Sequence, residues 1–199
     1  MTSSATRCSV PVLAVLCLAG CGGGPPNPPQ TPPLSSVSAP PTPSRLPPRP
    51  ATLRLDGLDP CALLTPAQVR QLKVEPGRAQ SDQTTPGSIT CAWSSFPMRP
   101  TNAWTATTIT DHGADYYLDT TGAQISQVDR FAAVLTTSPL QELATRQCIA
   151  VVDVAPEQSL QVQYLNPDGD LPGMNHQLAC QLARQAAELM VTNLSNRPR

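Results

Sequence analysis

The sequence predicts an α+β fold: a mostly antiparallel sheet flanked by helices, with a long C-terminal helix and two disulfides. Segments with the two-residue alternation of strands come in groups, and they do not alternate strictly with helices as in a parallel α/β sheet. The segment from about 172 to 193 repeats apolar residues at helical spacing. Four cysteines lie in the region expected to fold, an even number that is typical of a cross-linked exported domain.

The first helix of the predicted domain is short and carries its own start signal. Thr65 supplies an N-cap, Pro66 suits the first helical position, and Gln68 completes a capping box with Thr65. We expect this helix to end near Lys73.

Two further helices are predicted. A brief one spans about 111–120 and is capped by Asp111. The long C-terminal helix has apolar residues at Leu178, Ala179, Leu182, Ala183, Ala186, Met190 and Leu194.

Seven strands are predicted, at 78–85, 88–94, 102–110, 123–128, 130–137, 146–154 and 159–165. The last two form the clearest hairpin, because bulky side chains alternate on both sides of the turn 155–158. These side chains are Val152, Val154, Leu160, Val162 and Tyr164.

Residues 1–20 have the form of a lipoprotein signal peptide. Arg7 precedes an apolar run of about nine residues, which is too short to span a bilayer. The run ends in Leu18-Ala19-Gly20-Cys21, a small-residue cleavage pattern followed by cysteine. We therefore expect Cys21 to be the lipidated first residue of the mature protein, with an N-terminal helix and an incidental cysteine as the alternative.

Composition then divides the rest of the chain. We assign residues 21–58 to the lipidated cysteine and a proline-rich disordered tether, since 12 of the 24 prolines lie between Pro25 and Pro50. Residues 59–195 are assigned to a single α+β extracytoplasmic domain, and residues 196–199 to a disordered tail.

The domain cysteines are Cys61, Cys91, Cys148 and Cys180. Four cysteines allow three connectivities. The pairs Cys61–Cys91 and Cys148–Cys180 are favoured, because each joins a helix to a nearby strand and closes a loop of about 30 residues. A four-cysteine zinc site is the competing interpretation, but no two of these residues have CxxC spacing. We expect no metal and no cofactor.

Several motifs together resemble one known family. They are the lipobox, the proline-rich tether, the run from Asp59 to Thr65 (DPCALLT), Cys91-Ala92-Trp93, Cys148 followed by Val151-Val152-Asp153, and Cys180 in the last helix. The chain resembles an actinobacterial, mycobacterial-type lipoprotein family with a domain of unknown function 3558. The resemblance implies an envelope protein with an antiparallel sheet flanked by helices, and it brings no catalytic residues.

Motifs for chemistry are sparse. No GxSxG, SxxK or HExxH motif is present, so no catalytic residue is assigned. We interpret His112 and His176 as ordinary residues at helix starts. The loop 166–170 does not match a calcium-binding loop, although Asp168, Asp170 and Glu157 offer a weak cation site.

The formal net charge of −1, with 14% charged residues, argues against binding to nucleic acid. We therefore expect a lipid-anchored, non-catalytic binding or protein-interaction module on the extracytoplasmic side of the cell membrane. Its ligand would be an envelope protein, a lipid or a cell-wall fragment. The alternative is an envelope-acting enzyme with a carboxylate pair among Asp115, Asp119 and Asp153 that converges in one pocket.

Overall fold

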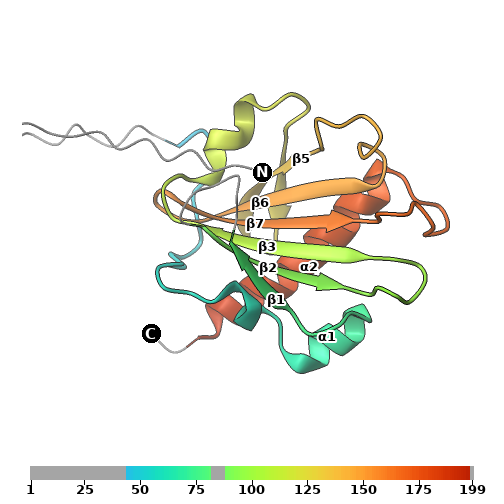
Figure 1. Ribbon diagram of the computed structural model, residues 1–199. Coiled ribbons are helices and arrows are strands. Elements are labelled where there is room, and N and C mark those ends of the chain that lie inside the picture. Colours follow the sequence, from blue (N-terminus) through green and yellow to red (C-terminus); the bar gives the residue numbers. More distant parts are fainter. Residues whose placement is uncertain (1–43, 82–87, 198–199) are drawn as a thin grey trace, which may run out of the picture. The chain divides into compact units, whose positions relative to one another are not determined.

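The computed structural model describes residues 44–81 and 88–197 and confirms the predicted α+β fold (Figure 1). Seven antiparallel strands form one sheet in the order β1-β2-β3-β7-β6-β5-β4. The strands are β1 (Arg78–Ser81), β2 (Ile89–Ser94), β3 (Ala103–Ile109), β4 (Gln124–Val128), β5 (Phe131–Thr136), β6 (Gln147–Ala155) and β7 (Gln158–Leu165). The helices are η1 (Pro60–Leu63), α1 (Pro66–Leu72), η2 (Ala114–Asp119) and α2 (His176–Ser195).

Two meanders build this sheet, and they meet where β3 pairs with β7. Trp104 of β3 lies opposite Tyr164 of β7, and their ring centroids are 5.0 Å apart. An aromatic pair of this kind favours one register, because a slip of one strand by one residue would put the two rings on opposite faces of the sheet. The pair therefore fixes the junction between the two halves.

The main core lies between the sheet and α2, which crosses one face of the sheet (Figure 1). Trp93, Trp104 and Tyr164 bring bulky rings to this face, and all three are buried. The buried side of α2 instead contains small residues at Ala179, Ala183, Ala186 and Ala187. Small side chains on the helix leave room for the rings of the sheet, which supports dense packing.

The hairpin formed by β6 and β7 agrees with its prediction, because every alternating residue named for it is buried in this core. The turn is shorter than expected: Ala155 pairs with Gln158, which leaves Pro156 and Glu157 as the loop. The register shifts between Asp153 and Ala155, where the ladder has a bulge.

Both disulfides have the pairing that the sequence favours. Cys61 of η1 is bonded to Cys91 of β2, and Cys148 of β6 is bonded to Cys180 of α2. Each bond therefore ties a helical element to the sheet. In the chain-entropy model, a closed loop of this length contributes roughly 3 to 4 kcal/mol.

Helix α1 starts as predicted, with the Thr65–Gln68 capping box present. The Asp111 cap is wrong. The N-cap position of η2 is Gly113, which makes no side-chain cap hydrogen bond, and the Asp111 carboxylate instead contacts the imidazole of His112. Helix α2 starts at His176 rather than near 172, because the Asn175 side chain accepts a hydrogen bond from the Leu178 N–H and caps it.

The segment 44–58, which the sequence analysis assigned to the tether, packs against the folded domain. Leu46, Leu53, Leu55 and Leu58 are buried. The N–H of Leu53 donates to the carbonyl of Val154 at 2.8 Å, beside the bulge of β6. These leucines pack against the folded domain, and the proline-rich composition of the segment does not predict this packing. The predicted signal peptide, Cys21 and most of the predicted tether lie outside the described residues.

Candidate functional site

The sheet face opposite α2 is divided between an apolar half and a polar half. The apolar half is a cluster formed by Leu46, Ala114, Ala132, Val134 and Val151. The polar half lies on β2, β3 and β7, where the hydroxyls of Thr90 and Thr107 are 2.7 Å apart. Helix η2 covers the apolar half, where Ala114 is buried and Tyr117 and Leu118 are packed against the cluster.

An open cleft of about 660 Å³ lies along η2. The residues that line it come from three parts of the sequence: the segment 111–120, Arg45 near the start of the described residues, and Glu157 in the β6–β7 turn. One guanidinium lines the cleft, that of Arg45. Four carboxylates also line it, and they belong to Asp111, Asp115, Asp119 and Glu157. We name this feature the η2 cleft.

His112 forms the centre of a polar and aromatic group in the η2 cleft. Its Nδ1 lies 2.8 Å from Oδ1 of Asp111, and its Nε2 lies 3.1 Å from the hydroxyl of Tyr117. Its ring is 4.4 Å from that of Tyr116, measured between centroids. The Ser159 hydroxyl donates to the His112 carbonyl at 3.2 Å, which holds the backbone of this loop on β7.

Arg45 lines the cleft and forms an ion pair with Asp119. Its Nη1 and Nη2 donate to the two carboxylate oxygens of Asp119 at 2.9 and 3.0 Å, and Nη2 also donates to the Asp115 carbonyl. This hydrogen bonding lowers the pKa of Asp119. The charge of Asp119 is therefore largely balanced by Arg45.

Asp153 lies beneath the cleft rather than in its wall. Its side chain is 5% exposed, and its Oδ2 is 3.4 Å from Nε of Arg49. Burial raises the pKa of Asp153, while the attraction of Arg49 and a hydrogen bond from the Ala114 backbone oppose the rise. A Cβ placed on Gly113 would lie 3.0 Å from Oδ1 of Asp115 and 3.5 Å from Oδ1 of Asp153. Glycine at this position thus fits the loop between the two carboxylates.

Of the three candidate carboxylates, only those of Asp115 and Asp119 line the η2 cleft. An acid–base pair needs two groups in one pocket whose pKa values are pushed apart. Asp153 has the raised pKa and is shielded from the cleft, whereas Asp119 is engaged by Arg45. The arrangement is therefore better suited to attracting positive charge than to moving a proton.

The weak cation site suggested by Asp168, Asp170 and Glu157 is not assembled. Asp168 and Asp170 both contact Nη1 of Arg99, at 2.7 and 2.9 Å. Glu157 lies in the turn before β7, whereas the two aspartates follow the far end of that strand. A guanidinium already occupies the position where a cation would balance the aspartates.

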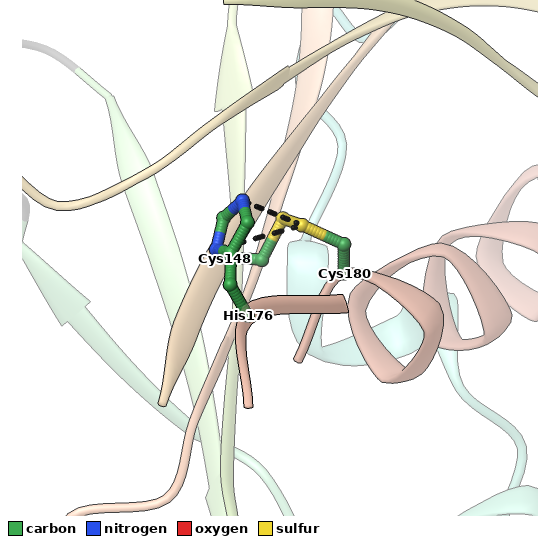
Figure 2. Close-up of side chains that lie close together, drawn as sticks. All are labelled: Cys148, His176 and Cys180. Carbon is green, nitrogen blue, oxygen red and sulfur yellow. Dashed lines mark hydrogen bonds between the residues drawn. A yellow bond between two sulfur atoms is a disulfide. The ribbon is translucent and has the colours of Figure 1, made fainter. Parts of the chain in front are cut away.

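His176 is the first residue of α2, which agrees with its sequence interpretation, but it also lies beside a disulfide. Its Nε2 lies 3.4 Å from the sulfur of Cys180, which is bonded to Cys148 (Figure 2). A second cleft of about 610 Å³ opens beside them. This group was not predicted from the sequence, although the spacing of His176 and Cys180 by four residues on one helix was a signal for it.

The model of one protein family matches residues 16–193, and its description is "Protein of unknown function (DUF3558)". The chain belongs to the DUF3558 family. No curated protein and no solved structure matches the chain. In this DUF3558 protein, the motifs behind the sequence resemblance are structural: Cys61, Cys91, Cys148 and Cys180 form the disulfides, and Trp93 is buried beside one of them.

None of the helices in the described part of this DUF3558 protein is both long and apolar enough to cross a membrane. Of the residues that line the η2 cleft, Arg45 lies in the proline-rich tether, whereas the segment 111–120 and Glu157 belong to none of the motifs behind the resemblance.

Proposed function

We propose that this DUF3558 protein is a lipoprotein of the actinobacterial type, anchored through Cys21 on the extracytoplasmic side of the cell membrane. The support is the cleavage pattern Leu18-Ala19-Gly20-Cys21 after a short apolar run. Two disulfides in the folded domain agree with an oxidising compartment. A lipid on Cys21 would supply the membrane attachment.

Metabolic labelling with a fatty-acid probe tests the anchor. The native chain should be labelled and recovered with membranes, while Cys21→Ala should lose the label. Cys17→Ser is the matched control, since it removes a cysteine just before the cleavage pattern and should leave labelling unchanged. Equal labelling of Cys21→Ala would contradict the anchor.

We further propose that the domain is a non-catalytic binding module and that the η2 cleft binds the positively charged group of its ligand, such as an amine. One observation carries this proposal: the cleft gathers four carboxylates against one guanidinium around an exposed aromatic ring. The ring belongs to Tyr116, which is 68% exposed. Carboxylates attract a cation by charge, and the face of an aromatic ring attracts it through the ring quadrupole.

The neighbouring basic groups do not cancel this charge. Arg45 forms an ion pair with Asp119, and Arg49 forms one with the buried carboxylate of Asp153. Asp111, Asp115 and Glu157 then remain as the carboxylates that face an incoming ligand. A cation that enters the η2 cleft therefore meets an excess of negative charge next to Tyr116.

Spermidine is a suitable probe, because it carries several amine charges and no anionic group. In a titration followed by backbone amide NMR, we expect shifts to concentrate in 111–120 and around Glu157 and Arg45. Triethylene glycol, a neutral probe of similar length, should produce no such pattern. Shifts that scatter over all acidic surface residues, or that appear equally with the neutral probe, would contradict the proposal.

A further inference from the structure

A histidine and two cysteines from distant parts of the chain meet at the start of α2 (Figure 2). His176 and Cys180 lie four residues apart on the same face of α2, and Cys148 comes from β6. The ligand atoms that the three side chains offer all lie within 4.8 Å of one another. Within residues 44–81 and 88–197, this is the only such group of three or more.

We propose that Cys148, His176 and Cys180 form a binding site for a thiophilic metal ion, such as Zn²⁺, when the disulfide between the two cysteines is reduced. Thiolate sulfur and imidazole nitrogen are the ligands that Zn²⁺ prefers. In the oxidised protein the two sulfurs are bonded to each other and cannot act as thiolates. Oxidation and metal binding are therefore alternative states of one site.

The distances suit a tetrahedral ion with little movement of the helix. Zn–S and Zn–N bonds of about 2.3 and 2.05 Å place a sulfur and a nitrogen ligand about 3.6 Å apart. The Nε2 of His176 is already 3.4 Å from the Cys180 sulfur. Two sulfurs on one zinc lie about 3.8 Å apart, which thiols reach by small side-chain rotations once the covalent bond is broken.

Access and charge also favour the site. The second cleft, of about 610 Å³, is lined by His176 and Cys180, and the Cys180 residue is 8% exposed. An ion can thus enter from the cleft, which leaves its fourth position open to water. Arg184 is the charged residue that lines this cleft, with Gln177 and Gln181 beside it. Two thiolates balance the two charges of Zn²⁺, so one guanidinium does not prevent binding.

Opening the disulfide requires a two-electron reductant, and a dithiol is one such class. Its two thiols give two electrons and two protons to the Cys148–Cys180 disulfide and form a disulfide themselves. The protein then holds two thiols, and Zn²⁺ binding releases a proton from each. While the ion is bound, the sulfurs are separated and protected from re-forming their bond.

The Cys61–Cys91 disulfide provides an internal control. Cys91 is fully buried, and its sulfur is packed against Gly77 and Trp93. No histidine belongs to a metal-ligating group with it in the described part of the chain. We therefore expect zinc to distinguish the two cysteine pairs.

The test uses the full chain with Cys8→Ser, Cys17→Ser and Cys21→Ser, so that only the four domain cysteines remain. The protein is reduced with a phosphine, desalted without oxygen, and titrated with Zn²⁺ against a chelating dye. We expect one zinc per reduced chain and none per oxidised chain. Cys148→Ser should abolish tight binding, His176→Gln should weaken it at least about tenfold, and Cys61→Ser should retain it.

Two further measurements address folding. If reduction loosens the domain, added zinc should restore the far-UV circular dichroism of the native chain. During reoxidation, zinc should slow formation of the Cys148–Cys180 bond but not of the Cys61–Cys91 bond, as measured by mass spectrometry. The proposal is overturned by no zinc binding, by equal affinity in His176→Gln, or by a reduced chain that zinc leaves unfolded.

Discussion

Nε of Arg49 lies 3.4 Å from Oδ2 of Asp153, so a residue far ahead of the first strand is paired with a carboxylate on β6. This pair lies beneath the η2 cleft, and Leu46 packs against η2 and the sheet just before it. The segment that leads into the domain is therefore part of the structure that shapes the candidate site.

The pH dependence of stability should reveal the state of Asp153. Burial raises its pKa in the folded protein above the unfolded value of about 3.9. A carboxyl with a raised folded pKa contributes stability when protonated, and it loses that contribution as pH rises through the folded pKa. The free energy of unfolding of the native chain, relative to Asp153→Asn, should therefore increase as pH falls from 7 toward 4. Urea unfolding at a series of pH values measures this difference. A difference that shrinks on acidification would mean that Arg49 outweighs burial.

Asp170 should show the opposite dependence. Hydrogen bonds from Arg99, Asn166 and the Thr101 backbone lower its pKa to about 2. A lowered pKa stabilises the fold above the unfolded pKa and ceases to do so as pH falls through the folded value. The stability deficit of Asp170→Asn, measured by urea unfolding, should be full at pH 6 and should largely vanish near pH 2. A deficit that does not change with pH would assign the effect to lost packing instead.

Leu46→Ala tests whether the segment 44–58 contributes to the stability of the domain. Leu46 is buried with Val134 and Val151. Removing its side chain should lower the free energy of unfolding by about 2 kcal/mol, as for other buried leucines. Denaturant unfolding measures the change, and Leu140→Ala is the control because Leu140 is exposed. Equal stability of both variants would show that the segment adds nothing.

Gly77 should tolerate no side chain. A Cβ at this position would lie 2.5 Å from the sulfur of Cys91 and 2.5 Å from Nε1 of Trp93. Gly77→Ala should therefore destabilise the domain by about 1 to 3 kcal/mol, the usual range for an overpacked core. The same substitution in a Cys61→Ala, Cys91→Ala background should cost less, because the sulfur is then absent. A cost that is identical in both backgrounds would place the clash on Trp93 alone.

Local sequence patterns predicted much of this fold. The β6–β7 hairpin follows from strict alternation around a short turn, and α1 follows from a capping box with a proline at the first position. Because the residues that make up each of these signals lie close together in the sequence, they can be recognised without knowledge of the fold. The order of the elements also favoured an antiparallel sheet over a parallel one, as the structure has it.

Long-range contacts were harder to predict. The leucines of the segment 44–58 follow a proline-rich stretch, and their burial depends on two distant surfaces. Leu46 packs with residues of η2, β5 and β6, whereas Leu53, Leu55 and Leu58 belong to the main core between the sheet and α2. Asp111 has an ordinary capping pattern, but His112 offers it a closer partner. The η2 cleft joins Arg45, 111–120 and Glu157, which are far apart in the chain. Only the fold brings such residues together.

The affinity of the η2 cleft for an amine tests the proposed binding role most directly. Calorimetry with spermidine should give a dissociation constant about two to five times weaker for Tyr116→Leu than for the native chain, because the aromatic face is lost. Tyr116→Phe should bind like the native chain, and Glu157→Gln should bind more weakly. Glu75→Gln, which removes an exposed carboxylate elsewhere, is the control. Equal affinities for all these variants would contradict a cation-binding role for the η2 cleft.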